Sequence, residues 1–192
     1  MSAVALLGVA LLTVAGYLEV ATRDGVVVLQ REKATGIDLI AEGQFDAPPA
    51  AVLALLLDYE RAPQFVKGVT ESRILSRGPA ELLVYQRLSL PIISDRDVTI
   101  RVTSGADGEV RWLAFKAANE DGPPPRSGIV RIPVDEGGWR LTPTADGKAT
   151  RARYSVKLDL GGSLPRFIGK GRAGADIPAL FETFRAQLRK KN

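Results

Sequence analysis

The segment from Thr70 to Leu160 most constrains the fold, because β-type stretches follow one another there with only short turns between them. Glycine, proline and aspartate occupy the breaks, and these residues favour tight turns. Strands joined this directly pair antiparallel, since a parallel pair needs a long crossover connection. The last stretch alternates most clearly, with apolar residues at Ala152, Tyr154, Val156, Leu158 and Leu160. We therefore predict an antiparallel sheet with one buried face and one wet face.

Helical patterns flank this segment. Two further strands are predicted at residues 26–30 and 37–45, followed by a helix that starts at Pro48 and Pro49 and ends near Tyr59. A second helical region covers residues 164–190, with breaks around 169–174 and at Pro178. Its later part carries an apolar stripe at helical spacing, made of Ile177, Leu180, Phe181, Phe184 and Leu188. The stripe needs an apolar partner, so the predicted class is α+β, with the curved sheet wrapped round the C-terminal helix.

Residues 3–18 form an unbroken apolar run, about as long as the core of a signal peptide and marginal for a helix that spans a membrane. No Lys or Arg precedes the run, and Val14-Ala15-Gly16 offers only a fair cleavage site. A signal peptide or membrane anchor is favoured over a helix packed on the domain. We therefore divide the chain into this segment, residues 1–18, and one folded domain, residues 19–190. The expected location is periplasmic, secreted or membrane-tethered, with cytoplasmic as the alternative.

The composition excludes several kinds of chemistry. The 192 residues include no cysteine and no histidine, so disulfides, thiolate zinc sites and imidazole bases are absent. No glycine-rich phosphate loop joins a strand to a helix, and no cofactor or metal is expected. The net charge of +4 favours an anionic surface such as lipid headgroups. The arginines are spread along the chain without interleaved aromatic residues, which argues against a nucleic-acid partner.

Several local motifs occur in a fixed order. The first helix begins with Phe45-Asp46-Ala47-Pro48-Pro49 and ends with Leu57-Asp58-Tyr59-Glu60, and Val84-Tyr85-Gln86 precedes Pro91-Ile92-Ile93-Ser94-Asp95-Arg96-Asp97. Two later landmarks are Gly128-Ile129-Val130-Arg131 and Asp159-Leu160-Gly161-Gly162-Ser163-Leu164-Pro165. Together these stretches, which cover roughly residues 18–188, resemble the bacterial-type START lipid-transfer family, a branch of the Bet v 1-like helix-grip superfamily.

The resemblance implies a helix-grip fold whose sheet and terminal helix enclose one lipid, such as a sterol, a phospholipid or a fatty-acid-like molecule. It implies a monomeric carrier that is not an enzyme and needs no cofactor. A polyketide cyclase or aromatase, or a quinone-binding chaperone-like protein, stays open as an alternative on the same fold. Some family members carry a buried acidic-basic pair on neighbouring strands. This chain has Gln86 and Val102 at those places, so a nearly neutral cavity is expected.

Strand alternation selects the residues that face inward, and the resemblance turns this inward set from a solid core into a cavity. Around Trp112 the alternation is ambiguous, since either Trp112 or the pair Leu113 and Phe115 can face inward. Gln86 is the polar exception, and its amide should bond to a ligand, a water or a nearby backbone group. Val134 is expected to continue the inward set. The predicted ligand-binding residues on the sheet and helix are Val84, Gln86, Leu88, Val98, Ile100, Val102, Trp112, Val130, Ile132, Trp139, Tyr154, Val156 and Phe181.

The ligand's entrance is predicted at residues 119–127 and 161–174, two loop segments that should flank one opening. In the second segment, Leu164, Phe167 and Ile168 are expected to form an apolar gate that contacts the ligand. The basic residues Arg166, Lys170 and Arg172 are expected to dock this gate on an anionic membrane, with ordinary solvated charges as the alternative.

Asp95, Arg96 and Asp97 form the most conspicuous charged cluster. In a strand the two acids share one face and the arginine takes the other. Carboxylates at a strand entry commonly bond nearby backbone donors, so we assign the cluster a structural role and not a catalytic one.

Overall fold

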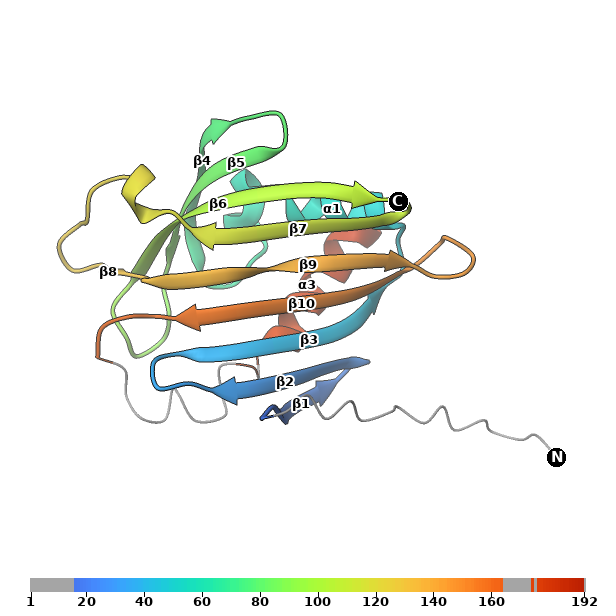
Figure 1. Ribbon diagram of the computed structural model, residues 1–192, viewed down its shortest axis with the longest axis horizontal. Helices are drawn as coiled ribbons and strands as arrows, with labels where there is room; N and C mark the ends of the chain where they lie inside the picture. The colour runs from blue at the N-terminus through green and yellow to red at the C-terminus, as the bar shows by residue number, and fades with distance from the viewer. Residues whose placement is uncertain (1–15, 164–173, 175, 192) are drawn as a thin grey trace.

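The computed structural model of the protein describes residues 16–163, 174 and 176–191 (Figure 1). The first half contains β1 (Leu18–Arg23), β2 (Val26–Glu32), β3 (Ile37–Phe45), α1 (Pro49–Leu56), the 3-10 turn η1 (Tyr59–Gln64), β4 (Val69–Arg77) and β5 (Glu81–Leu88). The second half contains β6 (Arg96–Asp107), β7 (Val110–Ala117), η2 (Asn119–Asp121), β8 (Val130–Arg131), β9 (Val134–Pro143), β10 (Thr150–Asp159) and α3 (Ile177–Lys191).

The ten strands of the described residues form one sheet in the order β1-β2-β3-β10-β9-β7-β6-β5-β4, with β8 beside β6. All neighbours in that path are antiparallel, and β8 pairs with β6 in parallel. Both helices lie behind the same face of the sheet in Figure 1. The predicted α+β class, a curved antiparallel sheet holding a C-terminal helix, is confirmed.

The inner face of the sheet holds α3 through an aromatic cluster. Phe181 is fully buried and stacks on Phe45 from β3, with ring centroids 5.1 Å apart. Trp139 from β9 lies 5.3 Å from the same Phe181 ring and 6.0 Å from Phe184. Gly43 makes this close approach possible, because a Cβ there would lie 2.8 Å from Cε1 of Phe181. The predicted apolar stripe of α3 therefore packs against the sheet as expected.

The ends of two elements differ from the sequence prediction. Leu18, which we assigned to the apolar N-terminal segment, is the first residue of β1, a strand that the sequence pattern did not predict. Pro178 was expected to interrupt a helix, but it lies in the first turn of α3. Proline is well tolerated there, because the first backbone N–H groups of a helix have no partner within the helix.

Residues 119–122 are held against the outer face of β6. Asn119 Oδ1 accepts a hydrogen bond from the Thr99 backbone N–H at 3.0 Å, and its Nδ2 donates to the Ile132 carbonyl at 2.8 Å. Gly122 packs so closely on Thr99 that a Cβ there would lie 1.8 Å from its Oγ1. These residues begin the segment 119–127, whose place beside the ligand entrance stays a prediction.

The charged cluster of Asp95, Arg96 and Asp97 connects β6 to neighbouring strands through its side chains. The Arg131 Nε donates to Asp97 Oδ1 at 2.6 Å, and the Tyr85 hydroxyl donates to Asp97 Oδ2 at 3.2 Å. The Arg87 guanidinium donates to Asp95 and, as the main cause, lowers the pKa of that carboxyl. The structural role is as predicted, but the partners are arginine and tyrosine side chains where we expected backbone donors.

Candidate ligand cavity

Two adjoining hollows lie between the inner face of the sheet and the helices. The deeper one, about 220 Å³, reaches from η1 to α3 and is lined by Leu55, Leu56, Asp58, Tyr59, Ala62, Phe65, Val66, Val69, Gln86, Leu88, Ile100, Phe115, Asp135, Trp139, Tyr154, Leu180 and Phe184. The outer one, about 490 Å³, is lined by Lys67, Gln86, Leu88, Leu90, Pro91, Ile92, Ile93, Val98, Ile132, Asp135, Tyr154, Val156, Leu158, Leu160 and Asp176. They share Gln86, Leu88, Asp135 and Tyr154. We call the pair the inner cavity.

Eight of the predicted ligand-binding residues line the inner cavity: Gln86, Leu88, Val98, Ile100, Ile132, Trp139, Tyr154 and Val156. Three others, Val84, Val102 and Phe181, are fully buried in the core but line neither hollow. Alternation identifies the inward face of a strand, but packing decides which inward residues reach the hollow.

Trp112 was in the predicted ligand-binding set, and the structure places it on the outer face of the sheet. Its ring covers Gly105 of the neighbouring strand, where a Cβ would lie 2.5 Å from Cζ2 of the indole. Leu113 is buried and Phe115 lines the deeper hollow, so this pair is the one that faces inward. The alternation within one strand could not predict this position, because the glycine that the tryptophan covers lies on the neighbouring strand.

Val130 and Val134 were expected to form one inward set with Ile132, but the strand breaks at Pro133. Val130 belongs to β8, lines neither hollow and packs beside Gly162, at 3.3 Å from the position of a Cβ there. Val134 begins β9 and is 40% exposed. The residues of β9 that face inward are therefore Asp135, Gly137, Trp139 and Leu141, whose cross-strand partners include Leu158 and Tyr154.

The predicted gate and docking residues lie outside the described part of the chain. They are Leu164, Phe167 and Ile168 for the gate and Arg166, Lys170 and Arg172 for membrane docking. Their roles stay predictions.

Asp135 is the main residue of the cavity that the sequence analysis missed, and it corrects the expectation of a nearly neutral cavity. Burial raises the pKa of its carboxyl group to about 7. Burial also raises the pKa of the Tyr59 and Tyr154 hydroxyls, and the nearby Asp135 carboxylate adds to both shifts. Counting back by twos from Trp139 would have identified Asp135 as inward, had the break at Pro133 been recognised.

Gln86 faces the cavity as predicted, and its amide has a protein partner. The Nε2 group donates to the Ser72 hydroxyl of β4 at 3.2 Å. The partner is a side chain and not one of the three kinds of group that we expected. The bond satisfies one of the amide's two N–H groups.

Ile92 lies at the mouth of the outer hollow, with an exposed side chain and an unusual backbone conformation. Its side chain is 78% exposed, and its backbone φ angle is 75°. A β-branched residue rarely adopts this left-handed conformation, because the side chain crowds the backbone. An exposed apolar side chain is thus held beside the cavity by a strained loop between β5 and β6.

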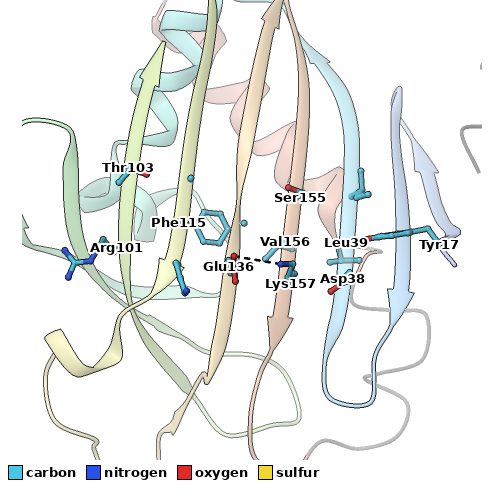
Figure 2. Close-up of a pocket in the computed structure, with 14 residues that line it drawn as sticks. Tyr17, Asp38, Leu39, Arg101, Thr103, Phe115, Glu136, Ser155, Val156 and Lys157 are labelled. Atoms are coloured by element: carbon cyan, nitrogen blue, oxygen red, sulfur yellow. Dashed lines mark ion pairs between the residues drawn. The ribbon is translucent and has the colours of Figure 1, made fainter. Parts of the chain in front are cut away.

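A third hollow lies on the outer face of the sheet and differs in character (Figure 2). It measures about 510 Å³ and crosses β3, β10, β9, β7 and β6. Charged side chains surround it, namely Asp38, Arg101, Lys116, Glu136 and Lys157. Figure 2 shows Glu136 and Lys157 paired across it, with 3.9 Å between their charged atoms. Such a polar rim suits water better than a lipid, so the inner cavity is the candidate ligand site.

None of the helices in residues 16–163 and 176–191 is both long and apolar enough to cross a membrane. No group of three or more acidic side chains in the same residues is arranged to hold a metal ion.

The sheet, the helices and the hollows between them define an α+β helix-grip domain with an internal, largely apolar cavity.

Residues 45–185 match the family described as polyketide cyclase / dehydrase and lipid transport, and the chain belongs to that family. An uncharacterized protein of Pseudomonas aeruginosa is 29% identical over 123 residues, which cover 64% of this chain and 60% of that relative. The chain's match thus spans less than two thirds of that relative's length.

Solved structures share the fold. A STAR-related lipid transfer protein from Xanthomonas axonopodis superposes with a TM-score of 0.81 at 24% identity, covering 91% of this chain and 99% of that one. Human STARD10 gives 0.81 at 20% identity over 91% and 74% of the two chains. An aromatase/cyclase from Streptomyces gives 0.61 at 13% identity over 80% and 94%. The chain therefore has the helix-grip fold of these structures.

Proposed function

We propose that this protein is a carrier without enzymatic activity, which holds one lipid molecule in the inner cavity and transfers it between membranes. The observation that supports this function is the outer hollow of about 490 Å³, which is walled mainly by leucine, isoleucine, valine and proline. Each Å² of apolar ligand surface removed from water contributes about 25 cal/mol. Several hundred Å² of lipid surface therefore suffice for tight binding without any charged contact.

Mass spectrometry of organic extracts tests the carrier function. The full chain is purified from its native host, and its bound lipids are compared with those of a variant whose outer hollow is filled by Val98→Trp and Val156→Phe. We expect one lipid class at a stoichiometry near one for the wild type and a strong decrease in the variant. Equal, trace amounts of mixed membrane lipids in both samples would contradict a carrier.

Transfer requires the cavity to open toward a membrane, and Ile92 supports a mouth at the β5–β6 loop. An exposed apolar side chain beside the opening can enter the lipid surface. Arg166, Lys170 and Arg172 would add attraction to anionic headgroups, about 1 kcal/mol per charge near such a surface. We expect Ile92→Ser, and separately neutralisation of the three basic residues, to slow transfer between anionic vesicles. Unchanged transfer in both variants would rule out docking at this end.

We expect the carrier to act as a monomer, and the apolar run of residues 3–18 predicts a periplasmic, secreted or membrane-tethered location. Determination of the mature N-terminus in the native host tests the location, and sedimentation of the purified protein tests the monomer. A cytoplasmic protein with residues 1–18 intact and unattached to a membrane would contradict the location.

A cyclase is the second candidate function, and Asp135 is the observation that favours it. A carboxyl group whose pKa is about 7 can take up and release a proton near neutral pH, as a general acid or base does. Incubation with a β-polyketone thioester tests this candidate. Cyclisation that is lost in Asp135→Asn would favour the enzyme over the carrier.

A further inference from the structure

The carboxyl group of Asp135 has no partner in the described part of the protein. Its carboxylate takes part in none of the hydrogen bonds or ion pairs found among residues 16–163 and 176–191. The other charged residues that line the inner cavity are Asp58, which pairs with Arg61, and Lys67 and Asp176 at the mouth. A half-buried carboxylate without a partner among the described residues is costly for folding, so a hydrogen-bond donor that enters the cavity would stabilise it.

Asp135 lies where the two hollows meet. It lines both of them, together with Gln86, Leu88 and Tyr154. Aromatic and aliphatic side chains surround this junction on the deep side, and aliphatic ones surround it on the side of the mouth. A ligand that fills the cavity therefore meets Asp135 with one specific part of its structure, while the rest of the molecule contacts apolar walls.

Hydrogen bonding and the apolar walls of the cavity decide which chemical group suits Asp135. An ionised carboxylate can only accept hydrogen bonds, so the ligand group must donate one. Hydroxyl and ammonium groups both qualify. An ammonium group, however, would have to leave water for a cavity whose walls are mainly apolar, and burying a cation costs far more than burying a hydroxyl group.

We infer that Asp135 recognises the cargo by accepting a hydrogen bond from a hydroxyl group, so that the protein selects hydroxylated lipids over plain hydrocarbons and over cationic amines. This inference rests on the proposed carrier function and makes it more specific. Tyr59 and Tyr154 line the same hollow as Asp135, so their hydroxyls add polar groups to this part of the cavity.

The raised pKa of Asp135 adds a measurable consequence. With a pKa of about 7 the carboxyl group can exchange a proton near neutral pH, and a hydroxyl group that donates a hydrogen bond to the carboxylate favours the charged form. Binding of a hydroxylated lipid should therefore release protons to the buffer. Binding of an ammonium lipid should release more of them, because a cation stabilises the carboxylate more strongly.

The test compares three probes with the same C16 chain: 1-hexadecanol, its methyl ether and hexadecylamine. Binding to the full chain is measured by displacement of an anilinonaphthalene sulfonate dye at pH 7.5, and proton exchange by calorimetry in two buffers of different ionisation enthalpy. The variants are Asp135→Leu and Asp135→Asn. Glu136→Leu is the matched control, because the neighbouring Glu136 lies on the outer face of the same strand.

We expect the wild type and Glu136→Leu to bind hexadecanol on the order of tenfold more tightly than its ether, with proton release. Asp135→Leu should lose this preference and bind the two equally, and Asp135→Asn should keep part of it without proton exchange. A preference for hexadecanol that survives in Asp135→Leu would overturn the role of Asp135. Tightest binding of hexadecylamine would overturn the hydroxyl in favour of a cationic lipid. Failure of all three probes to bind the wild type would overturn the carrier function itself, a result distinct from the others.

Discussion

Gln86 and Ser72 form a hydrogen bond across β5 and β4, with 3.2 Å between Nε2 and Oγ, so a polar side chain that lines both hollows is anchored to the sheet. Ser72 is only 8% exposed. Loss of either partner leaves the other without its bond in a place that water reaches poorly.

We therefore predict that Gln86→Leu lowers the free energy of unfolding by about 1 kcal/mol, the usual value of such a bond. Urea unfolding measures the change. The control is a double-mutant cycle with Ser72→Ala, in which the second substitution should add little to the first. Equal weakening of hexadecanol and of its ether in Gln86→Leu would assign Gln86 a structural role, whereas selective weakening of hexadecanol would make it a second ligand contact.

The stability of the protein should depend on pH through Asp135. Burial raises the pKa of this carboxyl in the folded protein to about 7, above its value near 4 in an unfolded chain. Between these values the folded protein binds more protons than the unfolded one. The contribution of Asp135 to the free energy of unfolding is therefore fully present below about pH 4 and is lost as the pH rises through about 7. Asp135→Asn should be more stable than the wild type at pH 8, by on the order of a few kcal/mol, and the difference should shrink toward pH 4.

Chemical unfolding of both proteins from pH 4 to pH 8 measures that difference. Other carboxyl groups, such as Asp95 and Asp146 with their lowered pKa values, titrate in both proteins and cancel in the comparison. A difference that does not change with pH would show that Asp135 titrates as in an unfolded chain.

Phe181 should be the main anchor of α3. Its ring is fully buried between Phe45 and Trp139, and Phe181→Ala leaves a large gap at the middle of the helix interface. We predict a loss of about 3–5 kcal/mol in the free energy of unfolding and a change in the fluorescence of Trp139. Phe181→Leu fills more of the gap and should cost clearly less. Similar costs for the two substitutions would indicate that the shape of the ring, not its volume, is required.

The ion pair between Arg131 and Asp97 should contribute to the stability of the sheet far more than a surface pair does. The Asp97 side chain is 2% exposed, so Arg131→Leu leaves a buried charge with only the Tyr85 hydroxyl as a side-chain donor. We predict a loss of about 3 kcal/mol or more, measured by urea unfolding. Arg153→Leu is the control, since Arg153 and Glu42 pair on the surface, and it should unfold within error of the wild type.

Much of the fold follows from the sequence because successive strands, turn residues and the stripe of α3 are local patterns. Tyr154 and Val156 alternate without interruption, and their inward position is correct. The wrong predictions occur where the pattern is interrupted or ambiguous. Pro133 separates β8 from β9 and shifts the alternation by one residue, which hid Asp135, and Trp112 faces outward because Gly105 leaves room for its ring.

Local sequence patterns could not predict which inward residues line the cavity. Val84, Val102 and Ile100 have the same inward direction, yet only Ile100 reaches a hollow. The difference depends on how η1, α1 and α3 fill the space above the sheet, which involves contacts between residues far apart in the chain.

The position of the aromatic cluster along α3 determines how the cavity can open. Phe181, Phe184 and Leu188 bury the later turns of the helix, whereas Asp176, just before its first residue, borders the mouth. The end of the helix beside the mouth therefore has fewer anchors than the end beside the deep hollow. A small displacement of its first turn would widen the mouth while the deep hollow barely changes, so one end of a lipid could leave while the other is still held.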